Sequence, residues 1–302
     1  MNRLIVVTGP TASGKTTLAI ELARAIGTEI ISADSRQLFR DLSIGTARPT
    51  PEELAAVPHH FIATLDLDEY YSAAQYEEDV LRLLPDIFSR CGGNAVMCGG
   101  SMMYVDAVCD GIDLLPTVSD ENRTRAYALY EAGGLPAVIL ELERLDPVYL
   151  RQAPDLKNHK RLVHALEISL EAGRPYSSML TGEKKSRPFG ILKFAIDHPR
   201  EELFSRINRR VEVMMSQGLL EEVRRVYPHR ELNSLNTVGY KELFAYLDGQ
   251  WDLATAVARI QKNTRVYAKK QMTWLRRDTS VIWLDPSRPL LPQIMGRLDA
   301  PQ

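Results

Sequence analysis

The segment that most constrains this chain lies close to its first residue. An apolar, β-branched run, Leu4–Thr8, leads directly into Gly9–Thr16, which matches the pattern G-x-x-x-x-G-K-[ST] in full. The apolar residues of the following stretch, Ala19–Ala25, have helical spacing. A strand, a glycine-rich loop and a helix in this order predict a phosphate-binding loop, in which backbone N–H groups and the positive end of the helix face an anion.

All eight residues of this loop are predicted to bind the diphosphate of a substrate: Gly9, Pro10, Thr11, Ala12, Ser13, Gly14, Lys15 and Thr16. Two of them are also predicted to act in catalysis. Lys15 supplies a mobile positive charge, and the Thr16 hydroxyl is the expected ligand of a phosphate-bound Mg²⁺, the predicted cofactor. The motif does not say which diphosphate the loop holds.

Short apolar runs recur along the chain and alternate with helical segments. The runs are Leu4–Thr8, Glu29–Ala33, Ala95–Cys98, Ile191–Ile196 and Val281–Leu284. This alternation predicts an α/β fold, a mainly parallel sheet with helices on both faces like that of the P-loop NTPases. Ligands of such sheets bind at the carboxyl ends of the strands, so the loops after the first three runs are expected to form the site.

The pattern changes between Pro116 and Pro188. No convincing strand occurs there, while Arg123–Glu131, Leu135–Leu145 and His159–Glu171 all have helical periodicity. We therefore predict a discontinuous α/β core of residues 1–115 and 188–302, and a helical insertion of residues 116–187.

The charge of the chain is distributed unevenly. The formal net charge is −2, but residues 1–150 carry −11 and residues 151–302 carry +9. This asymmetry predicts that the second half builds a surface for a polyanion, although an uneven spread over solvated faces is an alternative. The apolar share of 45% and the charged share of 25% are those of an ordinary globular chain.

The sequence gives little support for a membrane protein or for a zinc-binding protein. No apolar run reaches the roughly eighteen residues of a membrane helix, and the run after Arg3 is too short for a signal peptide, so we expect a cytoplasmic protein without membrane contact. Cys91, Cys98 and Cys109 show no C-x-x-C pairing, which argues against a disulfide framework or a zinc ribbon. Nothing in the sequence requires more than a monomer or an obligate protein partner.

Asp34 is the acidic residue nearest to a strand end at the predicted site. A carboxylate beside a diphosphate would be repelled unless it serves Mg²⁺ or a proton. Asp34 is therefore a candidate for outer-shell metal binding or for the general base toward an incoming nucleophile. The structural alternative is the N-cap of a helix, a position that Asp favours.

A strongly basic segment lies near the end of the chain. Residues 259–277 contain seven Lys or Arg and no acid. On a helix all seven fall within an arc of about 140°, with Ile260, Tyr267 and Trp274 on the other side. Such a stripe can follow a nucleic-acid backbone, and we predict that Lys262, Arg265 and Lys269 bind RNA. An ordinary solvated face is the alternative.

The chain resembles the bacterial tRNA dimethylallyltransferases, also called isopentenyltransferases. The resemblance runs through nearly the whole chain and rests on an ordered series of segments: GPTASGKT, ISADSRQLFRDLSIGTARP, PHHFI, YSAAQYEEDV, GGSMMYVDAVCDGI, NHKRLVHALEI, RINRRVEVMMSQGLLEEV, VGYKE and NTRVYAKKQMTWLRRD. A phosphate loop alone occurs in many families, but this series does not. The spacing of the three Cys residues offers no counterpart of the zinc-finger extension of eukaryotic relatives, so none is expected.

The resemblance implies an activity and two substrates. In that family the loop holds the diphosphate of dimethylallyl diphosphate. The prenyl group goes to the exocyclic amine of the adenine that follows the anticodon on its 3′ side, in the anticodon stem-loop of tRNA, and diphosphate is released. The alternatives are a P-loop small-molecule or nucleoside kinase, which would use the same loop for a nucleotide, and a non-catalytic nucleic-acid-binding module.

The resemblance also implies roles for residues outside the loop. The family's D-S-x-Q motif makes Asp34 the catalytic acid-base residue and places Ser35, Arg36 and Gln37 at the tRNA. Its G-G-T-x-x-Y motif becomes Gly99–Tyr104, where Ser101 keeps the catalytic hydroxyl but loses a methyl group. Arg123 is expected at the catalytic site. Further tRNA contacts are expected at Lys160, Arg161, Leu162, Val163 and His164, where Lys160 and His164 differ from the commoner residues.

Overall fold

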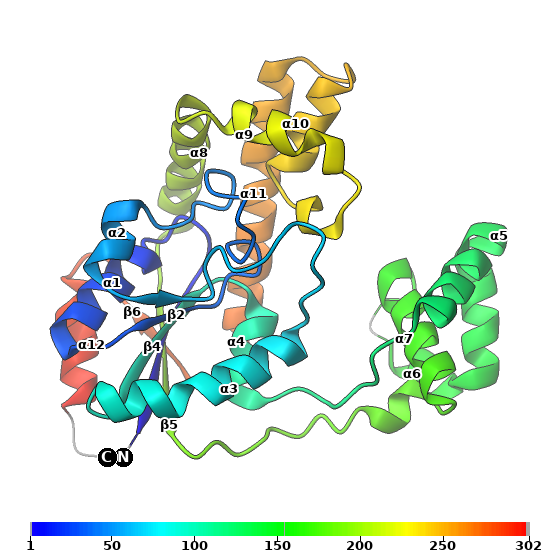
Figure 1. Cartoon of the computed structure of the whole chain (residues 1–302), viewed down its shortest axis with the longest axis horizontal. Coiled ribbons are helices and arrows are strands. Elements are labelled where there is room, and N and C mark those ends of the chain that lie inside the picture. The colour runs from blue at the N-terminus through cyan, green and yellow to red at the C-terminus, as the bar shows by residue number, and fades with distance from the viewer. Residues whose placement is uncertain (1, 154, 300–302) are drawn as a thin grey trace. The chain divides into compact units, whose positions relative to one another are not determined.

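The computed structural model describes residues 2–153 and 155–299. The chain divides into two compact units: Met1–Asp110 with Ser186–Gln302, called here the core unit, and Gly111–Lys185, called the helical unit. These boundaries lie within a few residues of those expected at 115/116 and 187/188. Figure 1 shows the elements of each unit.

The core unit is built on one sheet, and its fold confirms the predicted α/β class. Every strand pair is parallel, and the strand order is β3-β2-β4-β1-β5-β6. The strands are β1 (Arg3–Thr8), β2 (Ile30–Ser32), β3 (His59–His60), β4 (Asn94–Gly99), β5 (Gly190–Ile196) and β6 (Val281–Leu284). Because β1 lies between β4 and β5, the loop that follows it emerges near the middle of the sheet.

Helices cover both faces of the sheet. Along β1, Leu4 and Val6 pack on one side with α3 (Ala73–Arg90) and α4 (Met102–Asp110). Ile5 and Val7 pack on the other side with α1 (Lys15–Ile26) and α12 (Leu290–Leu298). A short helix, α2 (Pro51–Ala56), precedes β3. The central strands are buried on both faces, which explains their continuous apolar runs.

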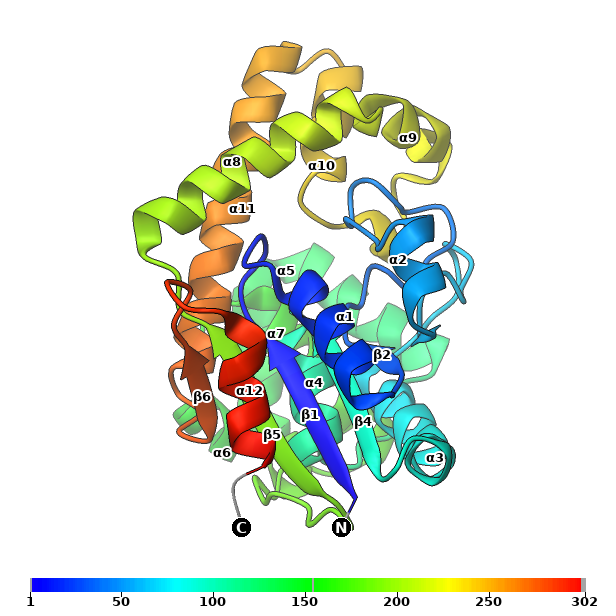
Figure 2. The same ribbon diagram turned by 90° about the vertical axis from the view of Figure 1, so that its left-hand side faces the viewer.

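A third group of helices belongs to the core unit. It contains α8 (Arg200–Ser216), α9 (Leu219–Val226), α10 (Tyr240–Leu247) and α11 (Leu253–Leu275), and Figure 2 shows α8 crossing α11. Buried Glu222 of α9 accepts hydrogen bonds from the backbone N–H groups of Ser43, Ile44 and Gly45 at 2.8–3.0 Å. The Tyr240 hydroxyl donates to the same carboxylate at 2.7 Å. Glu222 thereby fixes the loop after β2 to this group.

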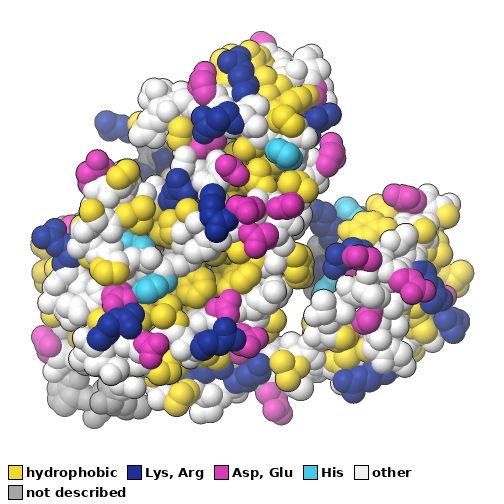
Figure 3. Space-filling model, in the orientation of Figure 1, with side chains coloured by type: hydrophobic (Ala, Val, Ile, Leu, Met, Phe, Trp, Pro, Cys, Tyr) yellow, Lys and Arg dark blue, Asp and Glu magenta, His cyan; other side chains and the backbone are white. Residues whose placement is uncertain are grey.

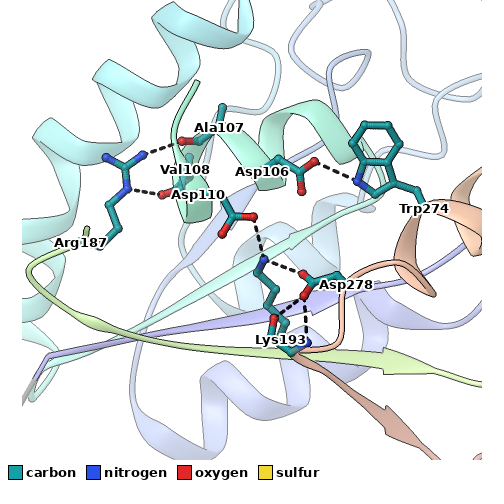
Figure 4. Close-up of polar contacts among 9 residues, drawn as sticks. Asp106, Ala107, Val108, Asp110, Arg187, Lys193, Trp274 and Asp278 are labelled. Atoms are coloured by element: carbon teal, nitrogen blue, oxygen red, sulfur yellow. Dashed lines mark hydrogen bonds and ion pairs between the residues drawn. The ribbon is translucent and has the colours of Figure 1, made fainter. Parts of the chain in front are cut away.

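A buried ion cluster joins α4, β5 and the segment after α11 (Figure 4). The Lys193 ammonium lies 2.8 Å from Asp278 and 3.5 Å from Asp110, and only 5% of its side chain is exposed. The Trp274 indole of α11 donates to Asp106 of α4 at 2.9 Å, and Arg187 donates to the carbonyls at the end of α4. Hydrogen bonds of this kind satisfy charges that would be costly to bury alone.

The helical unit contains α5 (Asp120–Leu145), α6 (Pro147–Gln152), α7 (His159–Ala172) and a 3₁₀ turn, Tyr176–Met179. Gly134 has φ 64° and ψ −160°, which breaks α5 in two between the predicted helical segments Arg123–Glu131 and Leu135–Leu145. Buried residues of α5 and α7, among them Leu142, Leu162 and Val163, form the core of the unit. Asp146 is also buried, and it accepts from Tyr149 and Ser177.

Candidate active site

The loop between β1 and α1 has the geometry of an anion site. Gly14 has φ 92° and immediately precedes α1, which begins at Lys15. The N–H groups in the first turn of a helix have no partner within the helix, and the helix dipole makes that end positive. Gly9 has φ 145°, a conformation that a side chain would strain. Both glycines of the motif are therefore explained by backbone conformation.

Other groups of the loop are already engaged. The Thr11 N–H donates to the Gln271 side chain at 2.9 Å, and the Ser13 N–H donates to the carbonyl of Pro10 at 3.3 Å. His198 and Arg206 donate to the carbonyls of Ser13 and Ala12. The N–H groups of Thr11 and Ser13 are therefore paired within the protein, while the contribution of all eight loop residues to an anion site stays a prediction. The N–H groups of Ala12 and Gly14, like those of the first turn of α1, form no hydrogen bond with the described residues.

Lys15 lies inside a group of charges. Its ammonium donates to the carbonyl of Pro10 at 3.3 Å. Burial lowers the pKa of Lys15 and the Arg210 cation lowers it further, while Cys98 and Asp34 act in the opposite direction. Burial likewise lowers the pKa of Arg210, against the attraction of Asp34. Two cations and one carboxylate thus converge beside the loop.

Asp34 follows β2 and caps a turn rather than a helix. Its Oδ1 accepts hydrogen bonds from the N–H groups of Arg36 at 2.9 Å and Gln37 at 3.4 Å. The residues after Asp34 form turns and not a helix. The alternative prediction that Asp34 is a helix N-cap is therefore wrong. Oδ2 has no hydrogen bond to the described residues, which leaves one carboxylate oxygen available to a ligand.

Ser101 ties the loop after β4 to the loop after β2. Its Oγ accepts from the Ser35 N–H at 2.9 Å, and it lies 3.2 Å from the Ser35 hydroxyl. The two loops can approach because residue 99 is glycine, since a Cβ there would overlap the carbonyl of Ala33. The Ser101 hydroxyl therefore holds the segment that carries Asp34.

Gln37 and Arg36 are fixed by the protein itself. The Gln37 side-chain amide donates to the carbonyls of Thr46 at 3.2 Å and Ala47 at 3.1 Å. Both of its N–H groups are therefore engaged within the protein, and its contact with tRNA stays a prediction. The Arg36 guanidinium donates to the carbonyl of Asn233 at 3.1 Å, and burial lowers its pKa.

A cavity of about 1180 Å³ collects these groups. Lys15, Thr16, Asp34 and Ser101 line it from the strand ends, and Arg210 and Tyr267 line it from α8 and α11. Partial burial and the Asp34 carboxylate raise the pKa of Tyr267 to about 12. These strand-end loops and the basic groups of α8 together line a site large enough for a diphosphate and a heterocycle.

The sequence alone indicates no role for the arginines of α8. Arg206, Arg209 and Arg210 all line the cavity, and the Arg206 guanidinium donates to the carbonyl of Ala12 at 2.8 Å. In the sequence, their segment is informative only through the family resemblance. Three arginines on the face of one helix are a local signal, but only the fold places that face opposite the phosphate loop.

Comparison with known proteins gives a consistent result. The family model described as IPP transferase matches residues 37–278. The chain belongs to this IPP transferase family. It is 54% identical over 285 residues to tRNA dimethylallyltransferase 1 of Phocaeicola vulgatus, with 94% of each chain covered. It is also 53% identical over 286 residues to tRNA dimethylallyltransferase 2 of Parabacteroides distasonis, with 95% of each covered.

A solved structure has the same fold as this IPP transferase. The crystal structure of the tRNA isopentenylpyrophosphate transferase of Bacillus halodurans superimposes with a TM-score of 0.71 at 34% identity, covering 98% of this chain and 94% of that one. The predicted family is thus confirmed, and with it the predicted α/β architecture.

Several expected tRNA contacts of this IPP transferase lie in the helical unit. Lys160, Arg161 and His164 of α7 are exposed, as is Arg123 of α5. Leu162 and Val163 are 0% and 2% exposed and pack in the apolar core of the unit. The predicted RNA contacts at these two positions are therefore wrong for their side chains, because helical spacing turns them inward.

The basic side chains of α11 differ in whether they face solvent or the protein. Lys262, Lys269 and Lys270 are exposed. Arg265 is half-buried and donates to the Asn208 side chain of α8 at 2.5 Å, so this guanidinium is directed partly toward the protein. On the opposite side of α11, Tyr267 and Trp274 stay partly exposed rather than packing fully.

The surface gives two further observations. On the face shown in Figure 3, Asp and Glu side chains are interspersed with Lys and Arg, so charges of one sign do not dominate that face. Among residues 2–153 and 155–299, no helix is long and apolar enough to cross a membrane.

Proposed function

We propose that this IPP transferase moves the dimethylallyl group of dimethylallyl diphosphate to the exocyclic amine of the adenine on the 3′ side of the tRNA anticodon. The observation that carries the proposal is the cavity in which Asp34 lies beside Lys15 and the first turn of α1. One part of this cavity suits a diphosphate leaving group, and another offers a base.

Bond formation needs a base because an adenine amine is a poor nucleophile. As the nitrogen attacks the prenyl carbon, a C–N bond forms, the C–O bond to diphosphate breaks, and its electron pair leaves with the diphosphate. The nitrogen then carries an extra proton. Asp34 accepts it through Oδ2, while its Oδ1 stays bonded to the turn that orients the carboxylate.

Bond breaking needs positive charge at the leaving group. Lys15 and Arg210 supply two cations, and the first turn of α1 supplies backbone N–H groups. Because these donors are fixed before the reaction, they stabilise charge that develops on the diphosphate without reorganisation. Ser101 and Gln37 act as positioning residues for the loop that carries Asp34.

The residues at the cavity fit a magnesium ion that is carried by the diphosphate. No group of three His, Cys, Asp or Glu suited to a metal occurs among the residues that the structure describes. Thr16 and Asp34 line the same cavity, and Mg²⁺ in phosphate sites is commonly held by one or two protein oxygens, phosphates and water. When bound, the ion would neutralise charge on the leaving diphosphate.

The tRNA is expected to bind through positive groups of both units. In the core unit these are Lys262 and Lys269 of α11, with Arg36 of the loop after β2. In the helical unit they are Arg123 of α5 and Lys160, Arg161 and His164 of α7, all exposed. The adenine must leave its stack to reach the cavity, as in other enzymes that act on a base. A cytoplasmic location fits such a substrate.

One incubation separates this proposal from a kinase that uses the same loop. The protein is mixed with total tRNA, Mg²⁺ and radiolabelled dimethylallyl diphosphate, and in parallel with γ-labelled ATP. We expect label from the allylic diphosphate in RNA, at the adenine next to the anticodon after nuclease digestion. Phosphate transfer from ATP to a small molecule without prenylated RNA would replace the proposal by the kinase alternative.

A further inference from the structure

Gln271 is a buried polar residue that the chemistry above does not use. It lies on the inner face of α11, and only 3% of it is exposed. Tyr267, one turn earlier on the same face, has its hydroxyl 3.5 Å from the carbonyl of Gly100. Trp274, on the next turn, binds Asp106 of α4. This face of α11 is therefore held along the segment that follows β4.

The amide of Gln271 joins two loops at the carboxyl ends of the strands. Its Oε1 accepts from the Thr11 N–H at 2.9 Å, and its Nε2 donates to the carbonyl of Gly100 at 2.8 Å. Thr11 belongs to the phosphate loop after β1, and Gly100 precedes Ser101 in the loop after β4. One side chain thus bridges the loop for the diphosphate and the loop that positions Asp34.

The bridge needs both a donor and an acceptor. Turning the amide over would place its N–H groups against the Thr11 N–H and its oxygen against the Gly100 carbonyl, so the partners fix its orientation. It also needs space, because a Cβ on residue 100 would lie 2.5 Å from the Gln271 Nε2. The glycine at 100 and the glutamine at 271 are therefore matched to each other.

We propose that Gln271 is a positioning residue that holds the phosphate loop in its diphosphate-binding conformation by locking Thr11 to Gly100. The inference rests on the proposed function only in naming diphosphate as the ligand. Without the bridge, the part-buried Thr11 N–H loses its partner and the buried Gly100 carbonyl keeps only the Tyr267 hydroxyl at 3.5 Å, so the loop gains alternatives that do not bind the anion.

The first test removes the bridge and measures binding without chemistry. Gln271→Met conserves the length and approximate volume of the side chain but has no amide. Affinity for inorganic diphosphate with Mg²⁺ is measured by calorimetry, and amide hydrogen exchange is followed across residues 9–16. We expect diphosphate to bind roughly tenfold more weakly and the loop to exchange faster, with unchanged tRNA affinity.

A matched variant on the same helix controls for a general effect on α11. Gln261→Met removes an amide that contacts Asn208 of α8 at 3.4 Å and has no contact with the phosphate loop. It should bind diphosphate like the wild type. Thermal unfolding checks that both variants keep the unfolding temperature of the wild type. If Gln271→Met then also binds diphosphate like the wild type, the proposed role is wrong whatever reaction the enzyme catalyses.

A second variant tests the donor directly through pH. In Gln271→Glu, a neutral carboxyl can donate to the Gly100 carbonyl as the amide does, but a carboxylate there would repel it. Burial raises the pKa of a carboxyl group, so the introduced side chain should gain its proton as the pH falls from about 8 to 6. The ratio of the diphosphate affinity of Gln271→Glu to that of the wild type should therefore rise toward one over this range. A ratio that does not change with pH, at either full or lost affinity, would overturn the assignment of the donor.

Discussion

The core unit and the helical unit present their predicted functional residues differently. In the core unit, polar side chains join segments that are far apart in the sequence, as Gln271 joins Thr11 and Glu222 holds residues 43–45. In the helical unit, the packing follows local helical periodicity, with Leu162 and Val163 inside and Lys160 and Arg161 outside. The difference teaches that the arrangement of the cavity in the core unit depends on contacts between distant segments, while the helical unit exposes basic side chains on α7.

The largest expected effect tests whether chemistry is confined to the core unit. Asp34→Asn keeps the cap on the Arg36 N–H but removes the base, so single-turnover prenylation should slow by about 10²–10⁴-fold with tRNA affinity nearly unchanged. Asp41→Asn, an exposed carboxylate in the same segment, serves as the control and should be near wild type. Wild-type turnover in Asp34→Asn would reduce Asp34 to a turn cap.

The next effect tests the statement that Leu162 is structural. Leu162→Ala should lower the free energy of unfolding by about 2–5 kcal/mol, because it opens a cavity in the core of the helical unit. The exposed neighbour change Lys160→Ala should alter stability by no more than about 0.5 kcal/mol. Urea unfolding followed by fluorescence measures both. A stable Leu162→Ala protein with weakened tRNA binding would restore the original prediction of an RNA contact.

The same contrast explains what the sequence alone could predict. The apolar runs located the strands β1, β2, β4, β5 and β6, and the phosphate loop located one side of the cavity, because these features depend on neighbouring residues. The bridge of Gln271 could not be predicted, since its partners are hundreds of residues away and a buried glutamine has no local signal. The hydrogen bonds of Gln37 to the carbonyls of Thr46 and Ala47, although these are only nine and ten residues away, could not be predicted either, because the loop between them has no regular periodicity.

A smaller effect concerns the ion cluster beneath α4. Hydrogen bonds from Lys193 and Ser280 outweigh the opposing effect of burial and lower the pKa of Asp278 to about 2. A lowered folded-state pKa contributes stability that is present above the unfolded value of about 3.9 and lost as the pH falls through the folded value. Asp278→Asn should therefore cost on the order of 2 kcal/mol at pH 7.

The pH dependence distinguishes this contribution from a lost side-chain contact. The difference in unfolding free energy between wild type and Asp278→Asn should shrink between about pH 5 and pH 2, when the wild-type carboxylate takes up its proton. Urea midpoints at pH 7, 5 and 3 measure it. A difference that stays constant over this range would show that the charge of Asp278 adds nothing to the stability of the cluster.

The smallest expected effect concerns the surface of α11, where the core unit presents charge to solvent as the helical unit does. Lys262 and Lys269 are exposed, whereas Arg265 already contacts Asn208. Each lysine that neutralises a phosphate should contribute about 0.9 to the slope of log affinity against log salt concentration for duplex RNA or DNA. Neutralising both lysines should thus reduce the slope by nearly two, while Arg265→Gln changes it less and destabilises the α8–α11 contact instead.

The binding of tRNA to the wild type, the double lysine variant and Arg265→Gln is measured at a series of salt concentrations. Equal slopes for wild type and the double variant would mean that this face of α11 does not meet the RNA, and that the exposed cations of the helical unit supply the electrostatic contacts.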